Sequence, residues 1–348
     1  MNKIIFSEKN GWGIITLNAP KALNSLDLSM IKAMDEKLRR WREDKNIHAV
    51  ILEGEGPKAF CAGGDVVSLY HSMVKKDPYA DDFFKNEYEL DQLIHNHEKP
   101  IVCFAGNIVM GGGIGIMNGC SHRIVSETTK MAMPEITIGL FPDVGGSYFL
   151  NKAPDGTGLY LALTATRFDG ADALFINMAD SFVKQENFPP LKEKLLQLSL
   201  SEAAEKKIDE TIEDFSSRDE KQIPQSQIKN HMEEIENLTS VSSIKEFHIK
   251  AKDLKSTDKW IQRGLAGFSA GSPTSAAVIF EQLKRGKELS LKEAFIQEYN
   301  LARQCVRHHD FSEGVRALLV DKDNNPRWSP DSIEKVGPSL VEEHFKAP

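Results

Sequence analysis

The sequence has no apolar run of the roughly 18–20 residues that a membrane-spanning helix needs. Its first segment, MNKIIFSEKNGWGIITLN, lacks the apolar stretch of a secretory signal and the Arg- and Ser-rich character of a transit peptide, so we expect a cytoplasmic protein. Lys and Arg number 43 against 51 Asp and Glu, and the net charge of −8 disfavours nucleic acid and anionic membranes as partners. A small polyanionic ligand remains compatible with this charge, because helix N-termini or a local basic patch can bind phosphates.

Cysteine is scarce as well, and the few cysteines form neither a CxxC pair nor a zinc-binding spacing. This pattern predicts reduced thiols in an intracellular protein. The neighbouring histidines His95 and His97, and His308 and His309, stand outside any HExxH-like frame, so we expect no metal site. The cysteines are Cys61, Cys103, Cys120 and Cys305.

Strand, glycine-rich loop and helix follow one another at least twice in the first half of the chain. The apolar run 49–52 leads into the loop GEGPKAFCAGGD and a helix from about Val66, and the run 101–105 leads into MGGGIG and another helix. This alternation predicts an α/β fold with parallel strands, in which ligands bind at the carboxyl ends of the strands, where both loops lie. Further elements are expected at residues 3–7, 12–17, 27–43 (capped by Ser25 or Asp27), 79–97 and 122–125.

Past residue 185 the pattern becomes helical, with few strand signals. We therefore predict a core over residues 1–185 that carries the chemistry, and a helical region over residues 186–348 that packs on this core. The charged stretch 203–235 is typical of solvated surface helices. Helices are expected at residues 186–198, 202–213, 223–236, 243–254, 258–267, 274–286 and 290–307.

Two glycine-rich loops have the composition of an oxyanion hole. At Gly63–Gly64 and at Gly111–Gly113 no Cβ atom keeps a ligand away from the backbone N–H groups. Each loop precedes a helix, so its donors lie at the positive end of the helix dipole. Two such donors on one carbonyl oxygen stabilise an enolate or a tetrahedral oxyanion by roughly 3–4 kcal/mol each. The alternative is that the glycines only permit tight turns; neither loop has the spacing of a dinucleotide-binding loop or a P-loop.

Two carboxyl groups stand in the irregular, apolar segment MAMPEITIGLFPDVGG, namely Glu135 and Asp143. Burial among apolar neighbours raises the pKa of a carboxyl group, which then serves as a base or nucleophile near neutral pH. The alternative is that Glu135 caps a local turn and that Asp143 caps a helix beginning at Val144–Gly146.

Together these segments resemble the crotonase (enoyl-CoA hydratase/isomerase) superfamily. ITLNAPKALNSLDLSM, KAFCAGGD, KPIVCFAGNIVMGGGIGI and MPEITIGLFPDVGG carry the resemblance over residues 3–185. FFKNEYEL, SPTS, EYNLARQCVRHHDFSEGVRALLVDKDNNPRW and the terminal EEHF are most similar to its 3-hydroxyisobutyryl-CoA hydrolase branch, and they extend the resemblance over nearly the whole chain. The resemblance implies an α/β fold with a crotonase-like ββα spiral core and a helical C-terminal region.

The resemblance also implies roles for individual residues. The amides of Gly64 and Gly112 would form the oxyanion hole, and Glu135 and Asp143 would be the catalytic acids. Glu87 would accept a hydrogen bond from the hydroxyl of a 3-hydroxyacyl group, the alternative being an exposed helix glutamate. The segments that bind the adenine and pantetheine of CoA fall on Lys21, Ala22, Leu23, Ala62, Gly63 and Asp65.

One departure from the family pattern favours hydrolysis. Hydratases of this family carry a second glutamate at the position of Gly115, which has no side chain to activate water. We therefore predict thioester hydrolysis, with (S)-3-hydroxyisobutyryl-CoA of valine breakdown as the leading substrate. Glu135 would attack the acyl carbon or act as general base, and Asp143 would position water or Glu135.

The same prediction includes neither a metal, nor a flavin, nor a nicotinamide, because CoA enters as part of the substrate. An enoyl-CoA isomerase or hydratase is the first alternative, and a non-catalytic acyl-CoA binding protein is the second. For the assembly, a monomer with the C-terminal tail folded over its own domain and a trimer-based oligomer both remain open.

Overall fold

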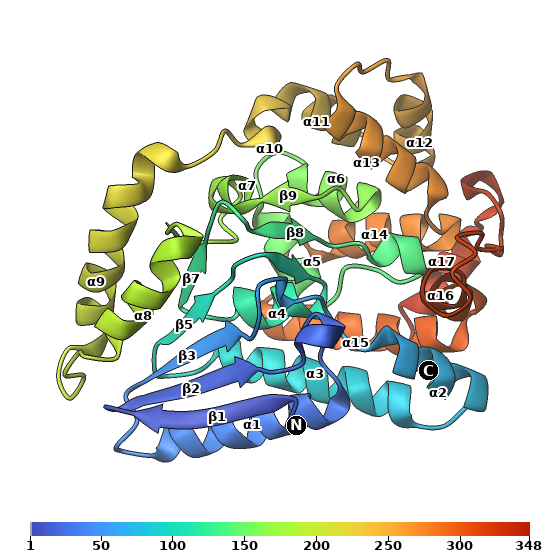
Figure 1. The fold of residues 1–348 in the computed structure, drawn as a ribbon. Coiled ribbons are helices and arrows are strands. Elements are labelled where there is room, and N and C mark those ends of the chain that lie inside the picture. Colours follow the sequence, from blue (N-terminus) through green and yellow to red (C-terminus); the bar gives the residue numbers. More distant parts are fainter. Residues whose placement is uncertain (1) are drawn as a thin grey trace. The chain divides into compact units, whose positions relative to one another are not determined.

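The computed structural model describes residues 2–348, which Figure 1 traces as a ribbon. By their contacts these residues form two compact units, each assembled from three separate segments of the chain. The sequence pattern divides the chain differently, into a core over 1–185 and a helical region over 186–348, and that division remains a prediction. Unit 1 contains residues 2–64, 89–131 and 168–226, and unit 2 contains residues 65–88, 132–167 and 227–348.

Unit 1 is built around a six-stranded sheet with the strand order β1-β2-β3-β5-β7-β10 (Figure 1). The first two strands pair antiparallel across a turn at Asn10 and Gly11, both of which have positive φ. The later pairings in this sheet are parallel, which confirms the predicted α/β core. The strands are β1 Ile4–Lys9, β2 Trp12–Leu17, β3 Ala49–Gly54, β5 Ile101–Phe104, β7 His122–Val125 and β10 Ser181–Phe182.

Helices cover both faces of this sheet. α1 (Leu28–Glu43) begins at Asp27, whose side chain accepts a hydrogen bond from a first-turn N–H, so Asp27 and not Ser25 is the cap. Gly13 of β2 faces α1, where a Cβ atom would lie 2.6 Å from the ring of Trp41. The neighbouring side chains of β2 point the other way and bury against α8 and α9. Other helices of unit 1 are α4 Gly112–Asn118, α7 Gly170–Phe175, α8 Phe188–Leu195 and α9 Ala204–Asp219.

A second sheet, in the order β4-β6-β8-β9, leads into the two glycine loops. The sequence pattern did not predict it, because its strands are only two or three residues long and too short for a recognisable alternation. β4 and β6 are parallel, so both loops leave the same edge of the sheet. The strands are β4 Ala59–Cys61, β6 Ile108–Met110, β8 Lys130–Ala132 and β9 Phe168–Asp169.

Unit 2 is helical. α6 is apolar on all sides and buried, and α11, α13 and α14 pack around it. α15 packs on the short helix α5, which follows Asp143, and α16 packs on the 3-10 helix η2 (Glu135–Ile138), which begins with Glu135. The helices are α2 Val66–Lys75, α3 Tyr79–His95 (up to Tyr88), α5 Gly146–Phe149, α6 Thr157–Thr164, α10 Gln227–Asn230, α11 Met232–Thr239, α12 Ile244–Asp253, α13 Lys259–Ala270, α14 Pro273–Gly286, α15 Leu291–Arg307, α16 His309–Val315 and α17 Pro338–His344.

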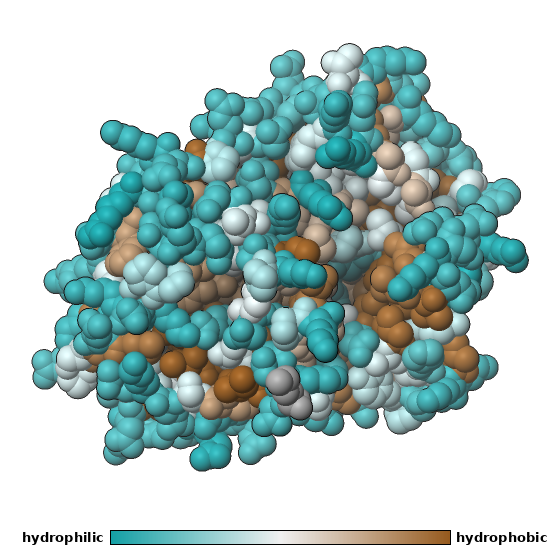
Figure 2. Space-filling model, viewed as in Figure 1, coloured by the Kyte–Doolittle hydropathy of each residue, from teal (hydrophilic) through white to brown (hydrophobic). Residues whose placement is uncertain are grey.

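The surface view in Figure 2 is mostly hydrophilic, and apolar atoms gather near the place where Figure 1 draws α16. α16 contacts α2 and the π-helix η6 (Arg316–Val320), which expose Val74 and Leu319 respectively. None of the helices in the described part of the chain combines the length and the apolar character needed to cross a membrane.

Candidate active site

The two glycine loops lie side by side within unit 1, as the sequence predicted. A Cβ atom on Gly63, whose φ is +102°, would lie 3.2 Å from the Met110 carbonyl oxygen and 3.6 Å from the Gly112 nitrogen. On Gly113 a Cβ atom would lie 2.3 Å from the carbonyl oxygen of Cys61, a distance that side chains do not tolerate. Glycine is therefore required for the loops to approach each other this closely.

The donor predicted at Gly112 occupies the first turn of α4. Gly111 is the residue before the helix, with φ +48°, and Gly112 is the first helical residue. N–H groups in a first helical turn have no partner inside the helix and lie at the positive end of its dipole. Gly64 precedes Asp65, whose side chain accepts hydrogen bonds from the N–H and hydroxyl of Ser68 and so caps α2. Asp65 thus has a structural role beside the predicted one.

The predicted CoA segment around residues 21–23 pairs with the first glycine loop. The Ala62 N–H donates to the Leu23 carbonyl at 3.0 Å, and the Leu26 N–H donates to the Gly63 carbonyl at 2.8 Å. Asn24, which the sequence analysis did not single out, is fully buried, and its amide donates to the carbonyls of two residues near β4. Lys21 and Ala22 are exposed on the adjoining 3-10 helix. Unit 1 therefore brings the segment around residues 21–23 next to Ala62 and Gly63, whereas Asp65, also predicted to bind CoA, belongs to unit 2.

Three predicted acids gather within unit 2. Glu87 of α3, Glu135 at the start of η2, and Asp143 before α5 are between 3% and 5% exposed. The reading of Glu87 as an exposed helix glutamate is wrong, because this residue is buried and experiences the charges of the other two. Asp143 accepts a hydrogen bond of 2.7 Å from the Tyr88 hydroxyl, a partner that the sequence analysis missed.

Burial dominates the titration of these acids. It raises the pKa of Asp143 to about 6, even though the hydrogen bond from Tyr88 favours the ionised form. Burial and the charge of Asp143 raise the pKa of Glu135 well above its usual range. The pKa of Glu87 is also raised well above its usual range, mainly by burial and then by the charges of Asp143 and Glu135. The negative charge of Asp143 thus contributes to the raised pKa of both Glu135 and Glu87.

One oxygen of Glu135, Oε2, is buried and has no hydrogen-bond partner among the described residues. Buried polar atoms normally have a partner, so an atom left without one requires an explanation, either a bound water molecule or a catalytic role. A carboxyl oxygen free to accept a proton or attack a carbon is what a base or a nucleophile provides. This free oxygen is compatible with the predicted role of Glu135, which remains a prediction.

The capping alternatives for Glu135 and Asp143 are wrong. η2 begins after Pro134, α5 begins after Gly145, and neither helix has a side-chain cap from its own segment. The N–H groups of Gly145 and Ser147 donate instead to the carboxyl group of Glu298 on α15. Sequence reasoning assigned Glu298 no role, although one signal was present, because this glutamate lies on the apolar stripe of α15 with the buried residues Ala294, Phe295, Leu301 and Ala302.

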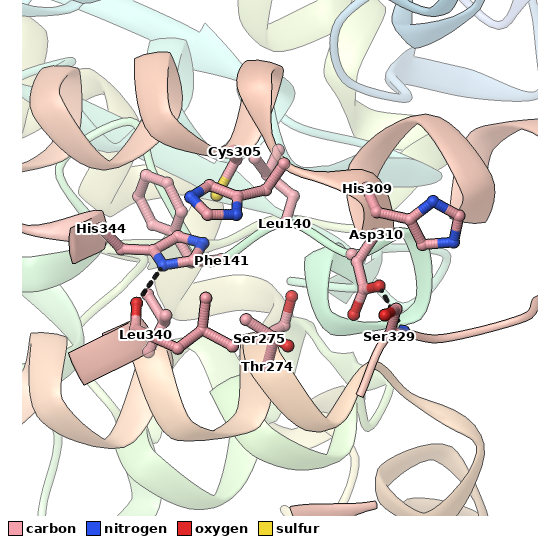
Figure 3. Close-up of a pocket in the computed structure, with 13 residues that line it drawn as sticks. Leu140, Phe141, Thr274, Ser275, Cys305, His309, Asp310, Ser329, Leu340 and His344 are labelled. Carbon is pink, nitrogen blue, oxygen red and sulfur yellow. Dashed lines mark hydrogen bonds between the residues drawn. The ribbon is translucent and has the colours of Figure 1, made fainter. Parts of the chain in front are cut away.

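A separate cavity in unit 2 is too small for an acyl group. It holds about 20 Å³, the room of one water molecule, among α14, α15, α16 and α17 (Figure 3). Ser272 and the Ser329 N–H both donate to Asp310 at its rim. The rings of His308 and His344 stack with centroids 4.1 Å apart. Within residues 2–348 no group of three or more His, Cys, Asp or Glu side chains is arranged to bind a metal ion.

Comparison with known proteins places these features in a family. The family model for enoyl-CoA hydratase/isomerase matches residues 12–345. The 3-hydroxyisobutyryl-CoA hydrolase, mitochondrial, of Xenopus tropicalis is 38% identical over 96% of this chain and 86% of its own length. The human protein of the same name is 36% identical over 99% of this chain and 89% of its own length.

Two solved structures share the whole fold. A structure titled as a carnitinyl-CoA dehydratase from Mycobacterium thermoresistibile has a TM-score of 0.91 and 32% identity, covering 99% of this chain and 97% of that one. One titled as an enoyl-CoA hydratase from Rhodobacter sphaeroides has a TM-score of 0.88 and 33% identity, with the same coverage. The predicted crotonase-like core with its helical C-terminal region is thereby confirmed, and the chain belongs to the enoyl-CoA hydratase/isomerase, or crotonase, family.

Proposed function

We propose that this protein is an acyl-CoA thioester hydrolase, with (S)-3-hydroxyisobutyryl-CoA of valine breakdown as its substrate. The observation that carries the proposal is the buried cluster of Glu87, Glu135 and Asp143, combined with Gly115 at the place of the second acid of a hydratase. The names of the relatives from Xenopus tropicalis and human support the same substrate.

In the proposed reaction, the amides of Gly64 and Gly112 stabilise the negative charge that develops on the thioester oxygen. The carboxylate of Glu135, after loss of its proton to solvent, attacks the acyl carbon, the C–S bond breaks, and the CoA thiolate leaves and takes up a proton from solvent. Water then hydrolyses the mixed anhydride, which releases the hydroxy acid and restores Glu135. In the alternative mechanism, which has no covalent intermediate, Glu135 acts as a general base and takes a proton from the attacking water. Asp143 positions this water or Glu135.

The remaining predicted residues bind the substrate. Glu87 accepts a hydrogen bond from the 3-hydroxyl of the acyl group. The CoA moiety is bound by Lys21, Ala22, Leu23, Ala62, Gly63 and Asp65. The proposal requires no metal, flavin or nicotinamide, because both bond changes are acyl transfers to oxygen. Tyr88 keeps the Asp143 carboxylate in place through its hydrogen bond.

A panel of CoA esters tests the substrate. Release of free thiol is measured with a thiol-reactive dye from 3-hydroxyisobutyryl-CoA, isobutyryl-CoA and crotonyl-CoA. The first two differ only in the hydroxyl, so a site that binds this hydroxyl prefers the first ester by at least about 100-fold in kcat/KM. Equal rates would remove Glu87 from the proposal.

The same panel distinguishes the alternatives. The two structural neighbours are titled as a dehydratase and a hydratase, and those activities release no thiol, nor does double-bond isomerisation. Loss of the enoyl absorbance of crotonyl-CoA without thiol release would therefore overturn the hydrolase in favour of a hydratase. Binding of all three esters with neither change would indicate an acyl-CoA binding protein.

The proposal further places the enzyme in the cytoplasm as a monomer. The four cysteines are buried and form no disulfide among residues 2–348, which fits a reducing compartment, whereas the relatives are named as mitochondrial proteins. The C-terminal helices α14 and α15 pack on α5 within their own unit, which leaves these faces occupied without a second copy. Cell fractionation tests the location, and light scattering in solution tests the monomer against a trimer.

A further inference from the structure

The turn that carries Asp143 is clamped by two residues from distant helices. We propose that Glu298 of α15 and Gln282 of α14 are positioning residues that fix the direction of the Asp143 carboxylate. The inference rests on the proposed role of Asp143 in thioester hydrolysis. It adds to that proposal two residues that touch no substrate and act through the backbone of the turn.

The backbone of this turn is strained. Val144 has φ +52° and Gly145 has φ +92°, so two successive residues lie in the left-handed region. Valine is β-branched and is rarely found there, because its Cβ substituents crowd the backbone. A conformation of this kind costs on the order of 1–3 kcal/mol and persists only where the surrounding structure imposes it. The turn therefore depends on contacts from outside its own segment.

Glu298 holds the turn on the C-terminal side of Asp143. It is fully buried, and its Oε2 accepts the Gly145 N–H at 2.8 Å while its Oε1 accepts the Ser147 N–H at 2.7 Å. Both oxygens act as acceptors, an arrangement that only a carboxylate provides, since the amide of glutamine would direct N–H toward N–H. Burial raises the pKa of Glu298 to about 8, although the hydrogen bonds from Ser147 and Gly145 favour the ionised form. The clamp is therefore complete above about pH 8, and the variants are compared there.

Gln282 holds the turn on the N-terminal side. It is fully buried, and its Nε2 donates to the Pro142 carbonyl at 2.7 Å and to the Ser147 hydroxyl at 2.9 Å. The clamp thus fixes residues immediately before and shortly after Asp143. Beyond the backbone, the carboxylate of Asp143 is held by the Tyr88 hydroxyl. Displacement of a catalytic group by about 1 Å costs on the order of 100-fold in rate, so loss of the clamp is expected to lower catalysis.

A double-mutant cycle separates positioning from a merely structural role. We compare Glu298→Gln, Asp143→Asn and the double variant in kcat and KM for thiol release. Glu298→Gln is expected to lower kcat by about 30–100-fold while KM changes by less than about threefold. Added to Asp143→Asn, it should lower kcat no further, because the group it positions is already gone. Equal losses in both backgrounds would show that Glu298 acts on the fold as a whole.

The matched control is Glu293→Gln on the same helix. Glu293 is exposed and closes a capping box with Ser290, a role that glutamine also fills. This variant should keep the kcat and KM of the wild type. Gln282→Met, which removes both donors at similar volume, should lower kcat by about tenfold in the wild type and not at all in Asp143→Asn. Full activity of this variant would exclude Gln282 from the clamp.

A second measurement does not depend on the reaction. Hydrogen exchange of the amides of Gly145 and Ser147 should become faster in Glu298→Gln and stay unchanged in Glu293→Gln. Unchanged exchange in Glu298→Gln would overturn the clamp even if the enzyme is a hydrolase. Should the wild type release no thiol, the proposed function fails, and the cycle is then applied to hydration of crotonyl-CoA while the exchange result decides the clamp.

Discussion

The two compact units contribute different kinds of chemical group. Unit 1 presents backbone N–H groups at two glycine loops, and unit 2 presents carboxyl groups buried among helices. Backbone donors require the absence of side chains, as the 2.3 Å distance at Gly113 illustrates. Carboxyl groups require the opposite, because packed side chains around them raise their pKa. Unit 1 is therefore tested by changes to the backbone, and unit 2 by changes to side chains.

The largest expected effect is the loss of the acid in unit 2. Glu135→Ala should lower kcat for thiol release by about 1,000-fold or more and leave KM nearly unchanged, because the predicted CoA-binding residues lie elsewhere. Glu135→Gln is the control that preserves side-chain volume and should lose as much activity. If either variant retained a tenth of the wild-type rate, Glu135 would have no place in the mechanism.

The second largest decrease in kcat is expected when the Gly112 N–H in unit 1 is removed. Gly112→Pro deletes the N–H of the first residue of α4, a position where helices accept proline. We expect kcat to fall by about 100–1,000-fold, the usual effect of losing one oxyanion-hole donor. Circular dichroism and thermal unfolding must first show that the variant is folded. Undiminished turnover by a folded variant would exclude this loop.

A smaller effect concerns the stability of unit 2. The folded-state pKa of Asp143 is raised to about 6, so the stability that its protonated form contributes is present below about pH 4 and is lost as the pH rises through 6. Asp143→Asn stays neutral and can still accept the hydrogen bond from Tyr88. At pH 7 it should therefore unfold in urea with a free energy on the order of 2 kcal/mol above the wild type.

This gain should disappear at pH 4, where the wild-type carboxyl group is also protonated in the folded state. The same variant should lose most of its thiol release at every pH, so stability and activity change in opposite directions. A variant less stable than the wild type at pH 7 would mean that the ionised Asp143 stabilises the fold.

The smallest expected effect is a gained activity. The wild type should not hydrate crotonyl-CoA detectably, because Gly115 offers no second acid. Gly115→Glu should gain slow hydration, followed by loss of the enoyl absorbance, and Gly115→Gln should gain none. The gain is limited because residue 115 is buried in α4, where a carboxyl group is costly. Rapid hydration of crotonyl-CoA by the wild type would contradict the prediction that Gly115 prevents hydratase activity. Asp143 would then be the second acid of a hydratase.

Local patterns predicted much of the fold. The helix expected at residues 27–43 is observed at Leu28–Glu43, and the strand expected at 101–105 is observed at Ile101–Phe104. Periodicity and capping are properties of neighbouring residues, so the sequence displays them directly. The second sheet was not predicted, because strands as short as Phe168–Asp169 are too short to show an alternation of apolar and polar residues.

The candidate site likewise contains residues that local patterns predicted and contacts that they did not. The loop glycines and Glu135 were recognisable from composition and from the family resemblance, although their roles remain predictions. The contacts of Tyr88 and Glu298 were not, because each depends on residues far away in the chain. Glu298 gave one indication, a charged residue on an apolar helical stripe, whose partner no local pattern identifies.

Glu298 and its hydrogen-bond partners are far apart in the sequence, so they are synthesised at different times during translation. Glu298 lies 153 residues after Gly145 and 151 residues after Ser147. Translation delivers Unit 1 in full by residue 226, whereas unit 2 needs the last third of the chain. A nascent chain therefore exposes the Asp143 turn without its clamp until α15 has left the ribosome. Premature termination before residue 298 yields a chain that carries Glu87, Glu135 and Asp143 but lacks the Glu298 contacts to the Asp143 turn.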